Sequence, residues 1–263
     1  MADPDLPAAF RLTGAVALVT GAGSATGIGL ATAELLAELG ATVALAATAE
    51  HVDHRVAELA AMGHTASGHV ADLTDPQQAR DLVADVSSLH GRLDIVVNNA
   101  GMVSVSGGFE SGTVAAVSPQ TWHAGLARNL DTAFFVTQAA LAHLPDGSGR
   151  IVNVSSVTGP VMAMRDEPVY AAAKAGMVGL TRSLAVDLGP RGITANAVAP
   201  GWIASGSQTD DEARQAVLTP LGRSATPAEV ASVIAWLCTP GAAYVTGQCI
   251  VVDGGNSIAE ERA

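Results

Sequence analysis

The sequence predicts an α/β fold, namely a single doubly wound sheet of seven mainly parallel strands with helices on both faces. Short apolar runs alternate with amphipathic helical stretches along the whole chain, and parallel strands need such helical crossovers. A length of 263 residues suits one large domain of this class. No composition shift or Gly/Ser/Pro-rich linker divides the chain. We therefore expect one domain over residues 1–263, with short tails at 1–11 and 256–263.

The predicted strands are short apolar runs. Residues 15–20 are nearly all apolar and lie between Gly14 and Gly21, which is typical of a strand buried on both faces. Similar runs predict the other strands at residues 41–47, 69–71, 93–97, 151–154, 193–198 and 249–252.

Apolar residues at helical spacing predict the helices between these strands. In the first helix Ile28, Leu35 and Leu39 share one face, and Gly40 ends it. Further helices are expected at residues 52–59, 76–89, 119–144, 168–188 and 227–237. The longest irregular stretch, residues 102–118, follows the carboxyl end of a strand. Open α/β sheets bind ligands at that edge, so we expect this stretch to line a site.

Composition and charge exclude several classes of protein. With 13 basic and 25 acidic residues the net charge is −12, which opposes binding to nucleic acid. Charged residues interrupt every long apolar run, so no membrane-spanning segment is expected. Residues 1–5 lack the basic start and apolar stretch of a signal peptide. Cys238 and Cys249 show no metal-ligand spacing, and the seven histidines form no ligand cluster. These features predict a cytoplasmic protein with free thiols and no metal.

A glycine-rich segment joins the first strand to the first helix. Residues 20–29 read Thr-Gly-Ala-Gly-Ser-Ala-Thr-Gly-Ile-Gly. Glycines permit a tight turn and close backbone approach, and a helix N-terminus offers N–H groups and partial positive charge to a pyrophosphate. A glycine-rich turn without a ligand is the alternative. The position between a strand and a helix favours a dinucleotide site.

The end of the second strand bears on the choice of cofactor. An acidic residue there would accept hydrogen bonds from the adenosine ribose and repel a 2′-phosphate. The sequence has Ala46, Ala47 and Thr48 instead, which favours NADP(H), with NAD(H) as the alternative. Thr48 can donate to a phosphate, and His51 or Arg55 can reach it from the following helix. Otherwise Thr48 merely caps that helix.

Tyr170 and Lys174 are the candidate reaction centre. Residues four apart share one face of a helix, so the phenol and the ammonium can share a pocket. A nearby cation favours the phenolate and would lower the phenol pKa from about 10, which allows proton transfer near neutral pH. Ser156, at the end of the fifth strand, can hydrogen-bond a substrate oxygen, and Ser155 is its rival.

Taken in order, these motifs resemble the short-chain dehydrogenases/reductases, and the resemblance covers residues 12–255. Two departures stand out. The loop is two residues longer than the family's Thr-Gly, three residues, Gly-Ile-Gly pattern. The family separates its serine from its tyrosine by 13 positions, whereas Ser156 lies 14 before Tyr170, and Ser155 lies 15 before it. Ser156 is therefore preferred, with one residue inserted around 164–167. Further extra length falls in residues 102–118.

The resemblance implies the site residues. The catalytic set is Asn129, Ser156, Tyr170 and Lys174, in which Asn129 orders a water that links Lys174 to solvent. Residues 206–221 resemble the family's substrate lid, and Ser205 stands where threonine is usual. The implied cofactor contacts are Gly21, Ser24, Thr26, Gly27, Ile28, Thr48, Asp72, Leu73, Asn99, Ala100, Gly101, Tyr170, Lys174, Pro200, Gly201, Ile203 and Ser205.

The resemblance implies a Rossmann-type enzyme that transfers hydride reversibly between NAD(P)(H) and a ketone or secondary alcohol. One alternative is a 3-oxoacyl-[acyl-carrier-protein] reductase, but that acidic partner would be repelled by a net charge of −12. The other is a catalytically silent nucleotide-binding regulator, which has no use for the four catalytic residues. A small-molecule substrate is expected. A homotetramer or homodimer formed through helices 119–144 and 168–188 is expected by resemblance.

Overall fold

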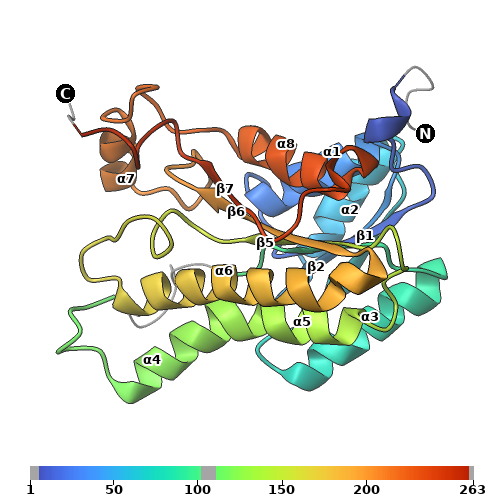
Figure 1. Cartoon of the computed structure of the whole chain (residues 1–263), viewed down its shortest axis with the longest axis horizontal. Helices are drawn as coiled ribbons and strands as arrows, with labels where there is room; N and C mark the ends of the chain where they lie inside the picture. Colours follow the sequence, from blue (N-terminus) through green and yellow to red (C-terminus); the bar gives the residue numbers. More distant parts are fainter. Residues whose placement is uncertain (1–5, 102–110, 261–263) are drawn as a thin grey trace.

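The computed structural model describes residues 6–101 and 111–260 (Figure 1). Parts of three predicted segments lie outside the described residues, namely 1–5 and 261–263 in the tails and 102–110 in the long irregular stretch. Among the described helices, none is long and apolar enough to cross a membrane.

The described strands form one seven-stranded sheet in the order β3-β2-β1-β4-β5-β6-β7. Every neighbouring pair is parallel, which confirms the predicted doubly wound α/β fold. The order reverses between β1 and β4, and open sheets of this kind bind ligands at the carboxyl ends of the strands at such a reversal. The strands are β1 (Val16–Thr20), β2 (Thr42–Ala47), β3 (Ala66–Val70), β4 (Ile95–Asn98), β5 (Arg150–Val154), β6 (Thr194–Pro200) and β7 (Cys249–Val252).

Helices cover both faces of the sheet (Figure 1). On one face lie α1 (Ile28–Glu38), α2 (Val52–Ala61) and α8 (Pro227–Cys238). On the other lie α3 (Pro76–His90), α4 (Pro119–Leu126), α5 (Thr132–Ala140) and α6 (Pro168–Leu188). The short α7 (Asp210–Ala216) stands apart from both layers. Three 3-10 helices complete the list: η1 (Ala8–Phe10), η3 (Gly189–Arg191) and η4 (Pro240–Ala242).

The sheet separates two apolar cores. Along β1, Ala17 and Val19 point into the core beneath α1 and α8, whereas Val16 and Leu18 point into the core beneath α3 and α5. All five residues of β1 are buried, as the continuous apolar run predicts.

Amide side chains join the centre of the sheet to the helices. Asn98 and Asn153 are partners in the β4–β5 ladder, and Asn98 Nδ2 donates to Asn153 Oδ1 at 2.8 Å. Asn153 Nδ2 in turn donates to Thr181 Oγ1 of α6 at 2.8 Å, and Asn98 Nδ2 also donates to Thr137 Oγ1 of α5 at 2.8 Å. These side-chain hydrogen bonds link β4 and β5 to α5 and α6, while the buried Asn98 Oδ1 has no partner among the described residues.

Three elements differ from prediction. The third strand is Ala66–Val70 rather than 69–71, because an edge strand that is half-exposed lacks a continuous apolar run. The helix expected over 119–144 is divided by a π-helix, η2 (Ala127–Asp131), and its last α-helical residue is Ala140. The expected lid contains α7, whose capping box pairs Thr209 with Glu212.

Candidate active site

The loop between β1 and α1 has no room for side chains where it approaches the end of β4. A Cβ on Gly21 would lie 2.8 Å from Ala100 Cα, and one on Gly29 would lie 2.6 Å from Asn99 Nδ2. Gly21 also has φ of +67°, which favours glycine. Gly27 is the N-cap of α1, and its lack of a side chain leaves the first N–H groups without a side-chain cap. The loop is therefore a backbone cradle that fits a pyrophosphate.

Side-chain hydrogen bonds hold this cradle to β4. Thr20 Oγ1 accepts from the backbone N–H groups of Asn99 and Ala100, both at 3.0 Å. Asn99 Nδ2 donates to the carbonyls of Thr20 and Gly21 at 3.0 and 3.1 Å. The Asn-Asn-Ala-Gly motif at residues 98–101 thus holds the glycine-rich loop against the end of β4.

The other predicted cofactor contacts lie at the same edge of the sheet. Asp72 Oδ1 accepts from Thr74 N at 3.0 Å and from Thr74 Oγ1 at 2.7 Å, which forms a turn directly after β3. Leu73, within this turn, is buried. In the glycine-rich loop, Ser24 Oγ accepts from Thr26 N at 3.4 Å, and Ile28 begins α1.

The two basic candidates near the end of β2 have different neighbours. Arg55 Nη2 is paired with Glu58 Oε1 at 2.8 Å, and its side chain is only 14% exposed. Its charge also acts on Glu34 of α1. Arg55 is therefore engaged between α1 and α2, whereas the His51 ring lies against Gly23.

The chain brings Ser156, Tyr170 and Lys174 together where β5 ends. Ser156 follows β5 by two residues, and its side chain lies close enough to the Tyr170 phenol, near the start of α6, to act on the pKa of that phenol. One turn further along α6, Lys174 Nζ lies 5.6 Å from the centre of the Tyr170 ring. The spacing of four residues thus places the phenol and the ammonium on one face of α6, as the sequence predicts.

Lys174 is a buried ammonium group. Its exposure is 2%, and Nζ donates to the Val154 carbonyl at 2.9 Å. Burial lowers the pKa of Lys174 to about 8, so the group remains mostly charged at neutral pH.

The expectation that Lys174 lowers the pKa of Tyr170 is wrong in its net direction. Burial raises the pKa of Tyr170, the hydrogen bond with Ser156 opposes this, and the charges of Glu167 and Glu212 raise it further. A phenolate here would be desolvated and would face two carboxylates, one from the start of α6 and one from α7. The phenol therefore keeps its proton at neutral pH, a form suited to donating that proton.

Ser155 and Ser156 have different partners. Ser155 is buried, and its Oγ donates to the Lys174 carbonyl at 2.9 Å. Ser156 Oγ accepts from Thr158 N at 3.1 Å and is the serine that contacts Tyr170. This geometry favours Ser156 over its rival as the residue that meets substrate.

Asn129 lies in the π-helix η2, which packs against α6. Its side chain is fully buried, and Nδ2 donates to the Gly125 carbonyl at 3.2 Å. A Cβ on Gly101 would lie 3.0 Å from Asn129 Oδ1, so glycine allows the end of the Asn-Asn-Ala-Gly motif to approach this amide. Single π-helical turns inside α-helices occur frequently at functional sites.

The segment after β6 reaches back to the glycine-rich loop. A Cβ on Gly201, next to Pro200, would lie 2.7 Å from Asp253 Cβ, and Ile203 forms a bridge with Ala225. A Cβ on Gly206 would lie 2.5 Å from Thr26 Oγ1. The segment after β6, which carries the predicted cofactor contacts Pro200, Gly201, Ile203 and Ser205, is thus in contact with the glycine-rich loop.

Two polar groups in the segment after β6 have different hydrogen-bonding states. Ser205 Oγ is hydrogen bonded to Ser207 Oγ at 2.9 Å. The buried Trp202 Nε1 has no hydrogen-bond partner among the described residues. Sequence analysis did not select Trp202, because an aromatic residue beside a Pro-Gly turn carries no distinct chemical signature.

Two of the three places where the chain exceeds the family pattern contact each other, namely the described end of 102–118 and the region of 164–167. Gly112 N donates to the Asp166 carbonyl at 2.6 Å, and Ser111 Oγ donates to Glu167 Oε1 at 2.5 Å. Asp166 has φ of +60°, and no other non-glycine residue in the described ranges has positive φ. Glu167 is the N-cap of α6 but makes no side-chain cap, since its carboxylate binds Ser111 instead. The segment 111–118 therefore rests on the start of the helix that carries Tyr170.

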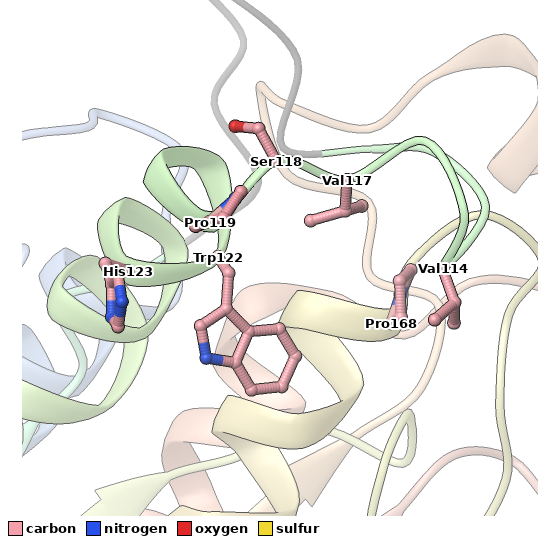
Figure 2. A pocket seen from close by; sticks show the side chains of 7 residues that line it. All are labelled: Val114, Val117, Ser118, Pro119, Trp122, His123 and Pro168. Atoms are coloured by element: carbon pink, nitrogen blue, oxygen red, sulfur yellow. The ribbon is translucent and has the colours of Figure 1, made fainter.

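A cavity of about 330 Å³ lies between this segment and the starts of α4 and α6 (Figure 2). Its walls are mostly apolar, and its lining residues are Val114, Val117, Ser118, Pro119, Trp122, His123 and Pro168. Figure 2 shows the Trp122 indole extending from α4 toward the start of α6. Pro168 precedes Tyr170 by two residues. Sequence analysis predicted that residues 102–118 line a site, but it did not predict that Trp122 lines it as well.

In the part of the chain that the structure describes, no three His, Cys, Asp or Glu side chains are grouped to hold a metal ion.

Comparison with known proteins agrees with this geometry. Residues 21–257 match a family model described as Enoyl-(Acyl carrier protein) reductase. A 3-oxoacyl-[acyl-carrier-protein] reductase of Thermotoga maritima is 39% identical, over 94% of this chain and 99% of the relative. A cis-4-hydroxycyclohexanecarboxylate dehydrogenase of Sinomonas cyclohexanicum is 40% identical, over 91% of this chain and 95% of the relative.

Solved structures show the same likeness. A short-chain dehydrogenase of Burkholderia cenocepacia, solved in complex with NADP, has a TM-score of 0.85 and 35% identity. The match covers 94% of this chain and 99% of that chain. With the Tyr170–Ser156–Lys174 cluster beside a backbone phosphate cradle, these matches identify the chain as an oxidoreductase that belongs to the short-chain dehydrogenase/reductase family.

Proposed function

We propose that this oxidoreductase works with NADP(H) on a ketone or secondary alcohol, with Tyr170 as the proton donor in reduction. The observation that carries the proposal is the position of the Ser156 hydroxyl beside the Tyr170 phenol, one helical turn from the buried Lys174 ammonium. A substrate oxygen that takes the place between the two hydroxyls would receive a hydrogen bond from each as negative charge develops on it.

Each residue has a role in this proposal. The bound nicotinamide supplies or accepts the hydride. Tyr170 gives its proton to the substrate oxygen, and Ser156 stabilises that oxygen. Lys174 places positive charge beneath the phenol after the proton has left. Asn129 positions a water through which the proton is replaced.

The cofactor would be held along the carboxyl edge of the sheet. The cradle at Gly21, Gly27 and Ile28, with Ser24 and Thr26, would bind the pyrophosphate. Thr48, Asp72 and Leu73 would meet the adenosine end. Asn99, Ala100, Gly101, Tyr170, Lys174, Pro200, Gly201, Ile203 and Ser205 would meet the nicotinamide half. NADP(H) is preferred to NAD(H) because β2 ends at Ala47 and is followed by Thr48, with no carboxylate to repel a 2′-phosphate.

A panel of ketones and secondary alcohols, measured with NADPH and NADH, tests the proposal. We expect NADPH-dependent loss of absorbance with at least one ketone. Binding of NADPH without turnover of any substrate would instead support the alternative of a silent regulator. A higher kcat/KM with NADH would contradict the choice of cofactor.

A 3-oxoacyl-[acyl-carrier-protein] reductase is the second candidate, because several relatives carry that name. Charge opposes it. The surface segments 142–146 and 185–188 contain no Lys or Arg, and the nearby Arg191 is paired with Asp146 at 2.7 Å. An acidic carrier would meet a protein of charge −12. Turnover of a carrier-bound substrate far above that of its free thioester analogue would reverse this ranking.

Assembly and location complete the proposal. Exposed apolar side chains on α5 and α6, Phe134 at 43% and Val186 at 77%, support a homotetramer or homodimer formed through these helices. Light scattering tests that state. Cys238 and Cys249 are free, which supports a reducing compartment such as the cytoplasm.

A further inference from the structure

We propose that His51 is the residue that recognises the 2′-phosphate of NADP(H). This inference rests on the proposed use of that cofactor and assigns its specificity to a ring at the N-terminus of α2, rather than to a basic residue of the glycine-rich loop.

The His51 ring lies directly on the phosphate cradle. A Cβ on Gly23 would lie 2.1 Å from His51 Nε2 and 2.7 Å from His51 Cδ2. The same Cβ would lie 2.9 Å from the Cβ of Ala47, the last residue of β2. Gly23, Ala47 and His51 therefore meet at one point. Here the first turn of the cradle faces the end of the second strand, where the adenosine ribose is read in folds of this type.

The His51 side chain is available to a ligand. It is exposed, and no hydrogen bond joins its ring to another described residue. It is the N-cap of α2 but makes no side-chain cap. An imidazole donates a hydrogen bond in either protonation state and carries positive charge when doubly protonated. Bonds of this charge-assisted kind to phosphate are roughly twice as strong as neutral ones.

Other cations in this region are absent or engaged. Residues 20–29 contain no Lys or Arg. Arg55, one turn beyond His51, is paired with Glu58 at 2.8 Å and also lies within electrostatic reach of Glu34. Thr48 follows the end of β2 and offers a hydroxyl but no charge. His51 and Thr48 therefore form the donor pair that fits a phosphate at this corner.

Binding of two small probes, adenosine 2′,5′-bisphosphate and AMP, tests the assignment without any turnover. The two differ only in the 2′-phosphate. By titration calorimetry we expect the wild-type protein to bind the bisphosphate more tightly. His51→Ala should weaken bisphosphate binding roughly tenfold and leave AMP binding unchanged. His51→Gln keeps a hydrogen-bond donor but cannot carry a positive charge. Its affinity for the bisphosphate should lie between that of the wild type and that of His51→Ala.

His54→Ala is the matched control, since His54 is exposed on the same helix. It should bind both probes like the wild type. An unchanged preference for the bisphosphate in His51→Ala would overturn the role of His51 and leave the use of NADP(H) standing. An equal loss of both probes would also overturn it, because that result indicates a general effect on the loop. A wild-type preference for AMP would overturn the NADP(H) proposal itself.

Discussion

Ser155 and Lys174 hold the end of β5 against the middle of α6. Ser155 Oγ donates to the Lys174 carbonyl at 2.9 Å, while Lys174 Nζ donates to the carbonyl of Val154, the residue before Ser155, also at 2.9 Å. Strand and helix are thus joined twice within two residues of Ser156. The contact between Ser156 and Tyr170 follows from this junction.

Substitutions of the two neighbouring serines should affect different properties, kcat for Ser156 and the free energy of unfolding for Ser155. Ser156→Ala removes the hydroxyl proposed to contact the substrate oxygen, so kcat should fall roughly 100-fold with little change in the free energy of unfolding. Ser155→Ala removes a buried hydrogen bond to α6 and should lower the free energy of unfolding by about 1 kcal/mol. Steady-state kinetics and urea unfolding of both variants measure this. The reverse pattern would show that Ser155 is the catalytic serine.

Tyr170→Phe should retain cofactor binding and lose turnover by several orders of magnitude, because the ring remains and only the proton donor is removed. NADPH binding, followed by fluorescence titration, and kcat are the two measurements. Turnover close to that of the wild type would eliminate Tyr170 as the acid.

Lys174→Met should make the protein inactive but more stable at pH 7. Burial lowers the pKa of Lys174 to about 8 from the 10.5 of an exposed lysine, so folding disfavours the charged form. That cost is about 3 kcal/mol while both states are protonated, and the lost bond to Val154 offsets about 1 kcal/mol of the gain.

The sign of the pH dependence follows from the same pKa. Between pH 8 and 10.5 the folded protein releases this proton while the unfolded chain keeps it, so wild-type stability rises with pH. The advantage of Lys174→Met should therefore shrink across that window. Urea unfolding at pH 7 and pH 10 measures both differences, and a variant less stable than wild type at pH 7 would contradict the argument.

Glu167 and Ser111 should have distinct effects although they are hydrogen bonded. Glu167→Gln removes a negative charge that raises the pKa of Tyr170, so that pKa should fall. The alkaline limb of kcat/KM for ketone reduction should then move to lower pH, because the phenol loses its proton earlier. Ser111→Ala keeps the charge, so the limb should stay in place while stability falls by about 1 kcal/mol. Identical pH profiles for wild type and Glu167→Gln would rule out this electrostatic effect.

The fold was predictable because its pattern is carried by local chemistry. The buried run of β1 and the capping and glycine signals at α3 are readable one segment at a time. Asp75 accepts from Gln77 N at 2.7 Å at the start of α3, and Gly91, with φ of +75°, follows its end. The grouping of Ser156, Tyr170 and Lys174 was predictable as well, since it depends on one helical spacing and one strand end.

What sequence analysis missed depends on contacts between distant segments. The contact of Ser111 with Glu167 joins residues 56 positions apart, and the contact of the His51 ring with Gly23 joins α2 to the glycine-rich loop. The raised pKa of Tyr170 arises mainly from burial, with Glu212 of α7 adding a charge from another element. None of these effects has a signature in a short window of residues.

The ladder from Asn98 through Asn153 to Thr181 bears on how the reaction centre tolerates mutation. The bond from Asn98 Nδ2 to Asn153 Oδ1 and the bond from Asn153 Nδ2 to Thr181 Oγ1 depend on one register of β4 against β5. A slip of one residue between β4 and β5 would break the bond between Asn98 and Asn153 and turn every side chain of β5 to the opposite face. Ser156 lies three residues beyond Asn153. Substitutions of Asn98, Asn153 or Thr181 should therefore displace the Ser156 hydroxyl before they unfold the protein.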